Sequence, residues 1–167
     1  MPAPSGNKTV AGGPSLRLAK LGIELAASST PLGANVESSD AGHFLFLSGT
    51  LPVVNPRLAI SGRLGENLSV KEGREAARIA SFNALAVAQE HLGNLDRPKK
   101  LVKRTVRMAT AERFFEHAVV ADGASDLYAQ IFGPETGHTR LLYGVYSLPI
   151  GVPVIVDTIF EIERPNN

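Results

Sequence analysis

The segment from Val70 to Leu92 constrains the fold most, because it has a helical pattern over its whole length and a signal at each end. Ser69 and Glu72 form a capping box, in which each side chain accepts a hydrogen bond from a free backbone amide at the helix start. Gly93 stands where a left-handed residue commonly ends a helix. One face carries charges and the other is rich in alanine, which allows close packing. The sequence therefore predicts a helix over residues 70–92 that packs against a β-sheet.

The first strands are predicted as a hairpin over residues 35–48. Residues 36–38 enter it, residues 39–42 turn, and residues 43–47 leave. The leaving arm is an unbroken apolar run, which is typical of a strand covered on both faces.

Three later segments also have the pattern of strands. In residues 101–110 apolar side chains alternate with charges, and residues 139–148 and 154–162 are two strands joined by a segment rich in proline and glycine. Two shorter helices are expected, one with Ser15 as its N-cap and one over residues 124–132. Because the strands come in two batches, each followed by a helix, the order predicts an α+β fold: a mixed β-sheet with helices packed on one face.

The last strand indicates what covers the other face. Val154, Val156, Thr158, Phe160 and Ile162 share one side and can pack against helices. Ile155, Asp157, Ile159 and Glu161 share the opposite side. This mixture of apolar and acidic groups suits a subunit interface better than open water. We therefore expect the uncovered face to be buried by oligomerisation.

Length and composition set the domain organisation and exclude several classes of protein. The chain has 167 residues and 44% hydrophobic residues, which fits a single domain. Residues 1–14 are rich in Pro, Gly, Ser and Ala and are predicted to be a flexible tail, with one domain over residues 15–167. The chain has no cysteine, which excludes disulfides and thiolate catalysis. No apolar stretch is long enough to cross a membrane and no signal peptide is evident, so we expect a cytoplasmic protein.

Metal and nucleic-acid sites are not expected. None of the four histidines has the i,i+4 partner of a helical metal site, and no glycine-rich phosphate loop follows a strand, so neither metal nor cofactor is predicted. Residues 97–107 carry a basic run, but no aromatic residue interrupts it to stack on bases. We expect its charges to divide between the two faces of a strand, on a solvated edge paired to acids.

Four motifs resemble those of the YjgF/RidA family, in the same order. They are Leu47-Ser48-Gly49-Thr50-Leu51-Pro52, the run Gly65-x-x-Leu68-Ser69-Val70-x-Glu72-Gly73-x-x-Ala76-Ala77-Arg78, the segment Asp122-Gly123-Ala124-Ser125-Asp126-Leu127 with Phe132-Gly133, and Arg140 placed eight residues before Leu148-Pro149. The second and third are similar to a less characterised branch of the family. The resemblance extends over about residues 42–162.

This resemblance implies a chorismate-mutase-like homotrimer with clefts between neighbouring subunits. Characterised members hydrolyse enamines and imines such as 2-aminoacrylate to a 2-keto acid and ammonia, and others have been described as ribonucleases or translation inhibitors. The first hypothesis is therefore an imine deaminase that binds small 2-keto or 2-imino acids. The second is a non-catalytic trimer that binds small carboxylates, and a ribonuclease is a distant third.

The resemblance also implies which residues form the binding site. Arg140 would grip the ligand carboxylate, since a guanidinium offers two parallel charge-assisted hydrogen bonds. Gly49 would allow the backbone to approach the ligand, and Leu142 would supply a backbone amide. Asn35 occupies the place of an aromatic residue in an early loop, and Asp122 stands where the branch commonly has asparagine.

Two features leave the roles of these residues open. Arg140 could instead pair with Asp157 or Glu161 as an ordinary structural ion pair. The family's active deaminases carry a glutamate at the position that Ile155 occupies here. An isoleucine side chain cannot transfer a proton. Asp157 lies two residues further on the same face of the strand and is the alternative proton-handling group. The sequence does not decide between the deaminase and the non-catalytic binder.

Overall fold

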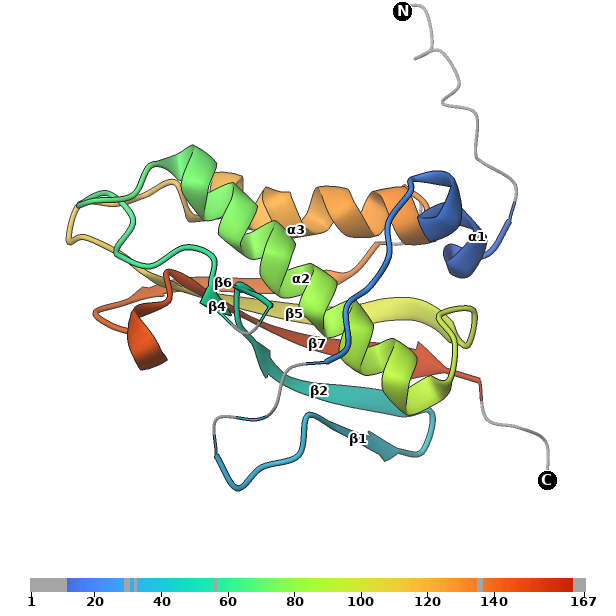
Figure 1. The fold of residues 1–167 in the computed structure, drawn as a ribbon. Helices are drawn as coiled ribbons and strands as arrows, with labels where there is room; N and C mark the ends of the chain where they lie inside the picture. Colours follow the sequence, from blue (N-terminus) through green and yellow to red (C-terminus); the bar gives the residue numbers. More distant parts are fainter. Residues whose placement is uncertain (1–11, 29–30, 32, 56, 135–136, 164–167) are drawn as a thin grey trace, which may run out of the picture.

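The computed structural model describes residues 12–28, 31, 33–55, 57–134 and 137–163. These residues form an α+β fold in which two long helices lie across one face of a mixed sheet (Figure 1). Along the chain the elements are α1 (Pro14–Lys20), β1 (Ser38–Ala41), β2 (Phe44–Thr50), β3 (Val53–Val54), β4 (Arg57–Leu58), α2 (Val70–Leu92), β5 (Pro98–Ala109), α3 (His117–Phe132), β6 (Thr139–Val145), a short 3-10 turn (Pro149–Gly151) and β7 (Val154–Ile162). The predicted fold class, with its helices on one side of the sheet, is confirmed.

The long helix α2 has the predicted bounds and both predicted caps. The Ser69 hydroxyl accepts a hydrogen bond from the Glu72 amide at 3.2 Å, and the Glu72 carboxylate accepts one from the Ser69 amide at 2.8 Å. The hydrogen bonds that the Ser69 amide and hydroxyl donate to the Glu72 carboxylate lower the pKa of Glu72. Gly93 ends the helix with φ +83°, in the left-handed region that favours glycine.

Two other helix predictions need correction. Helix α1 starts at Pro14 with Gly13 as its N-cap, because Ser15 is already inside the first turn and donates its amide to Asp96 at 3.0 Å. Helix α3 begins at His117, seven residues before the predicted start at Ala124. Residues 117–123 contain Gly123 and Asp122, which weaken a helical pattern in the sequence, whereas packing against α2 stabilises the helix in the fold.

The order of the strands in the main sheet is β1-β2-β7-β5-β6. Strands β1 and β2 form the predicted hairpin, although the turn occupies only Gly42 and His43. Strand β5 is an interior strand: it pairs antiparallel with β7 and parallel with β6. Consequently β6 and β7 are not neighbours, and the two strands joined by the segment rich in proline and glycine do not form a hairpin.

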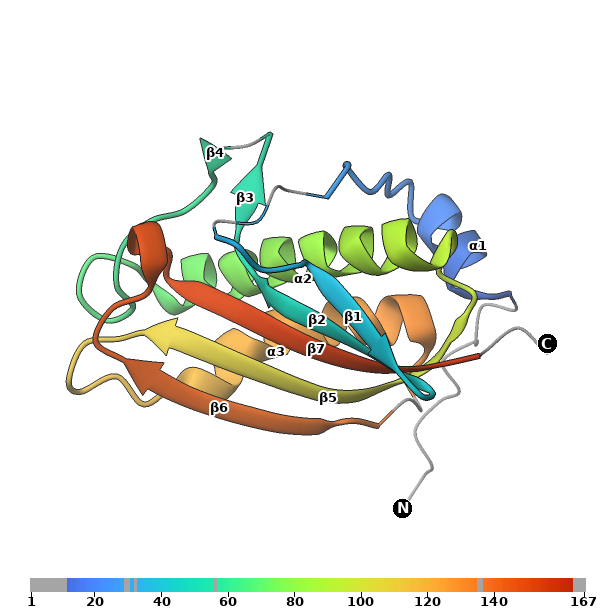
Figure 2. The same cartoon turned by 90° about the horizontal axis from the view of Figure 1, so that it is seen from below.

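The two faces of the sheet differ sharply. The side under α2 and α3 holds the core, and the prediction that Val154, Val156, Thr158, Phe160 and Ile162 face the helices is confirmed by their burial. No helix of the described chain covers the opposite face (Figure 2). Phe44 and Phe46 of β2 point to that side and are 42% and 43% exposed. The expectation that β2 is covered on both faces is therefore wrong for the single chain.

Residues 1–11 of the predicted flexible tail lie outside the described part of the chain. Among the described residues, no helix is long and apolar enough to cross a membrane.

Candidate functional site

Gly49 lies at an irregularity of β2, where the pairing with β7 shifts between Leu47 and Thr50. A Cβ atom on Gly49 would lie 2.6 Å from Cγ2 of Ile155 and 2.9 Å from Oδ1 of Asp157. Both contacts are shorter than real Cβ contacts allow, so the close approach of β7 requires glycine here. Three of the residues singled out from the sequence thus meet at one place on the uncovered face.

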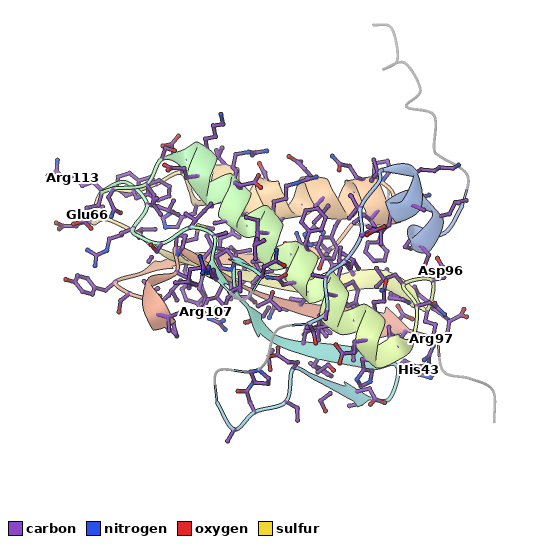
Figure 3. All side chains as sticks on the ribbon, viewed as in Figure 1. His43, Glu66, Asp96, Arg97, Arg107 and Arg113 are labelled. Atoms are coloured by element: carbon purple, nitrogen blue, oxygen red, sulfur yellow. The ribbon has the colours of Figure 1, made fainter. Side chains whose placement is uncertain are left out.

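Beside Gly49, Arg107 and Asp157 form a bidentate ion pair. Nη1 and Nη2 of Arg107 lie 2.9 and 2.6 Å from the two carboxylate oxygens of Asp157, and Nε donates to the Tyr143 hydroxyl at 2.7 Å. Arg107 is labelled in Figure 3. The hydrogen bond that Arg107 donates to Asp157 raises the pKa of Arg107 above its ordinary value. Both carboxylate oxygens of Asp157 are thus already engaged by Arg107, which argues against Asp157 as the proton-handling group.

Arg140 lies on the edge strand β6 and points to the helix side of the sheet. Its Nη1 donates to the Asp122 carboxylate at 2.6 Å and to the Ser125 hydroxyl at 3.3 Å, both on α3. The suggested pairing with Asp157 or Glu161 is wrong, because those residues belong to β7 and face the other side. Leu142 follows on the same face as Arg140 and packs partly against the core. The Arg140 site, as we call Arg140 with Asp122 and Ser125, has 27% of the arginine side chain exposed.

A second arginine lies beside Arg140, inside the core. Arg104 is the register partner of Arg140 on β5 and is fully buried. Its guanidinium lies 3.9 Å from the ring centroid of Tyr128, and within the described chain none of its three nitrogens has a hydrogen-bond partner. Burial lowers the pKa of Arg104. The arrangement adds positive potential next to Arg140, because a charge is weakly screened in the interior.

A groove with a volume of about 1110 Å³ also borders Gly49. Asn35, Gly49 and Ile155 line it, together with the segment 22–28 and the hairpin of β3 and β4. The amide of Asn35 donates to the Ser48 hydroxyl and to the Val36 carbonyl, each at 3.3 Å. We call this hollow the Gly49 groove. It does not include Arg140, Leu142 or Asp122.

The residues predicted to bind one ligand therefore form two separate groups in a single subunit. Asn35, Gly49 and Asp157 belong to the uncovered side of the sheet near β2 and β7, whereas Arg140, Leu142 and Asp122 belong to the helix side at β6. Strands β7 and β5 lie between β2 and β6.

A family model described as "YjgF/chorismate mutase-like, putative endoribonuclease" matches residues 15–162. The chain belongs to this YjgF/chorismate mutase-like family. Protein TCP17 of Trypanosoma cruzi is 39% identical over 148 residues, which cover 88% of this chain and 92% of TCP17.

Solved structures of YjgF-like proteins agree with this assignment. A protein of Shewanella oneidensis MR-1 has a TM-score of 0.87 at 31% identity, over 90% of this chain and all of that one. Escherichia coli TdcF, solved with bound serine, has a TM-score of 0.59 at 21% identity, over 83% of this chain and 94% of TdcF, and so supports the fold alone.

In this YjgF-family chain part of the basic run is paired to acids. Lys99 lies 3.7 Å from Glu163, and Lys100 lies 3.7 Å from Glu161. The predicted pairing to acids is confirmed, but its place on a sheet edge is wrong, since β5 is an interior strand. No group of three metal-ligating side chains occurs among the residues that the structure describes.

Sequence reasoning missed Arg107, Tyr143 and Arg104 as parts of the YjgF-like sites. Alternation along β5 could have placed Arg107 on the same face as Asp157, because both strands have a period of two. The burial of Arg104 has no such signal, since a basic residue in a charged run is normally solvated.

Proposed function

We propose that this YjgF-family chain forms a homotrimer that binds small 2-keto or 2-imino acids between subunits. In this proposal the Arg140 site of one subunit faces the Gly49 groove of the next. The observation that carries it is the separation of the two groups: the Arg140 guanidinium is at one edge of the sheet, and the described residues that line the groove, near the other edge, include no basic side chain. A second subunit is the simplest way to bring them together.

The uncovered face of the sheet supports the assembly. Phe44, Phe46, Leu141 and Tyr143 are each between 38% and 48% exposed there, and β2 and β6 contribute two of them each. Apolar and aromatic side chains spread over a sheet face are typical of interfaces rather than of open water.

Phe46→Asp is expected to shift the protein from trimer to monomer, because it would place a charge inside the proposed interface. Light scattering at micromolar concentration measures the change. Val119→Asp is the matched control, since Val119 is 43% exposed on the outer helix α3, and it should leave the trimer intact. A parent protein that is a stable monomer would contradict the assembly.

The ion pair of Arg140 with Asp122 suggests how a ligand is bound. Asp122 occupies the guanidinium with a contact of 2.6 Å, so an incoming carboxylate has to compete with an acid already in place. Ser125 gives the site a neutral donor and acceptor beside it. We infer that Arg140 binds the ligand carboxylate and that Asp122 weakens this binding by competing for the guanidinium.

Asp122→Asn is expected to strengthen the binding of 2-oxobutanoate by about tenfold, because the competing charge is removed while a side-chain oxygen remains for Arg140. Arg140→Ala should weaken binding by about tenfold to a hundredfold, which corresponds to about 1.5–3 kcal/mol for a hydrogen bond to a charged group. Isothermal titration calorimetry measures both. Asp126→Asn serves as the control, since Asp126 pairs with Arg74 elsewhere on α3. Unchanged affinity in Arg140→Ala would refute the proposal.

Binding is better supported than hydrolysis. Imine hydrolysis needs a group that can donate a proton and activate water; Ile155 is apolar, and Asp157 is bound to Arg107. TdcF with bound serine shows that a protein of this fold can hold a small amino acid. Deaminase activity is the second candidate, and a cytoplasmic location would suit either function.

A further inference from the structure

We propose that the acid bound by this protein is a monocarboxylate with a large apolar chain, and that the chain lies in the Gly49 groove. The inference rests on the proposed function, because it takes Arg140 of a neighbouring subunit as the partner of the carboxylate. It adds the substrate class, which neither the family nor the Arg140 site defines.

Size is the first argument. The Gly49 groove has a volume of about 1110 Å³, slightly above the roughly 300–1,000 Å³ of pockets that hold drug-sized ligands. 2-Aminoacrylate has only a few non-hydrogen atoms and would leave most of this space to water. A ligand with several more carbons fits the groove better.

The lining is the second argument. Away from Gly49, the walls are mainly apolar and come from three separate elements: the segment that follows α1, the β3–β4 hairpin, and one face of α2. They include Ile23, Leu25, Val53, Val54, Leu58 and Phe82. Ile155 belongs to the same surface, at the place where active family members carry an acid. The replacement of that acid by isoleucine thus extends the apolar wall as far as Gly49.

Charge is the third argument. Within the described residues that line the groove, the charged side chains are Glu24 and Glu37, and none is basic. Burial and the nearby Glu90 raise the pKa of Glu37. Acids on the wall repel a second anionic group, so a dicarboxylate should be excluded while an uncharged chain is accepted. The single carboxylate of the ligand must then find its cation outside the groove.

Binding of three acids to the full-length protein tests the inference: 2-oxobutanoate, 2-oxooctanoate and the dicarboxylate 2-oxoadipate. Each buried methylene is worth about fourfold in affinity. We therefore expect 2-oxooctanoate to bind on the order of a hundredfold more tightly than 2-oxobutanoate, and 2-oxoadipate to bind no more tightly than 2-oxobutanoate. Calorimetry on the parent protein gives all three constants.

Val54→Asp should lower the ratio of the 2-oxooctanoate to the 2-oxobutanoate affinity by at least tenfold, because it puts a charge in the wall. Val54 is 49% exposed, so the variant should fold. Val119→Asp adds the same charge outside the groove and should leave the ratio unchanged. If the two monocarboxylates bind with equal affinity and Arg140→Ala weakens both, the preference for a large apolar chain is refuted while the proposed function stands. Affinities that do not respond to Arg140→Ala would overturn the proposed function itself.

Discussion

Gly123→Ala is expected to lower the free energy of unfolding by about 2 kcal/mol or more, the largest stability effect of any single methyl group we consider. A Cβ atom on Gly123 would lie 2.2 Å from the backbone oxygen of Arg74 and 2.9 Å from its Cα. Alanine is favoured over glycine inside a helix by about 1 kcal/mol. The clash reverses that gain, because overpacking a tight contact typically costs about 1–3 kcal/mol and a helix backbone cannot rotate away as a side chain can.

The damage should spread from α3 to the Arg140 site. Moving α3 away from α2 would strain the ion pair of Arg74 with Asp126, in which the two groups lie 2.7 Å apart. It would also shift Asp122 and Ser125, the neighbours of Gly123 that contact Arg140. We therefore expect the variant to bind carboxylates less tightly as well as to unfold more easily.

Two other glycines calibrate the measurement. A Cβ on Gly73 would meet side chains, Cδ2 of Leu64 at 2.6 Å and Cγ2 of Val120 at 3.0 Å, so Gly73→Ala should cost less, about 1 kcal/mol. A Cβ on Gly137 meets nothing within 4 Å, and Gly137→Ala should be neutral within about 0.5 kcal/mol. Urea denaturation of the three variants gives the order. Equal stability of Gly123→Ala and Gly137→Ala would show that the helices are not packed so closely.

The sequence predicted α2 and β7 almost to the residue because each carries its own evidence. The caps of α2 are local hydrogen bonds between Ser69 and Glu72, and the alternation along β7 follows directly from which face is buried. Helix α3 was predicted too short, since its first turns depend on contact with α2 rather than on local preference. The strand order was missed at β6 for the same reason: its parallel pairing with β5 is a long-range contact that no local pattern records.

Some members of the candidate site were predictable from the sequence, but its arrangement was not. Gly49, Asn35 and Arg140 could be named from the resemblance to the family, whereas their separation depends on the sheet order, in which β7 and β5 lie between β2 and β6. The ion pair that occupies Asp157 needs the register of β5 against β7, in which Thr105 lies opposite Asp157 and Arg107 opposite Ile155. Arg107 then reaches Asp157 diagonally, a contact that sequence spacing alone does not indicate.

Ile155→Glu is expected to raise the rate of ammonia release from 2-aminoacrylate by up to about a hundredfold over a weak parent. The substitution restores a group that can transfer protons, and general acid–base catalysis contributes about 10²–10⁴-fold. The upper part of that range is out of reach, because Arg107 lies opposite residue 155 and would hold the new carboxylate in its charged form.

In the structure a glutamate at position 155 would have a hydrogen-bond partner, but it would also lower the stability of the protein. Arg107 uses three of its N–H groups on Asp157 and Tyr143, which leaves two of the five for another acceptor. However, Ile155 is only 9% exposed, and the contact with Gly49 leaves little room. We expect the variant to lose about 1–3 kcal/mol of stability, the usual range for placing a polar group at a largely buried apolar position.

Ile155→Gln separates proton transfer from shape. It has nearly the size of glutamate but cannot act as an acid or base at neutral pH, so it should stay as slow as the parent. Each protein is then measured again with Arg140→Ala, which should slow Ile155→Glu if the carboxylate is gripped as proposed. A parent as fast as Ile155→Glu would show that the glutamate is dispensable. If all variants are inert while the parent binds 2-oxobutanoate, the protein binds carboxylates without hydrolysing them. Ile155→Glu would have restored activity if the proton donor at that position were the only group missing.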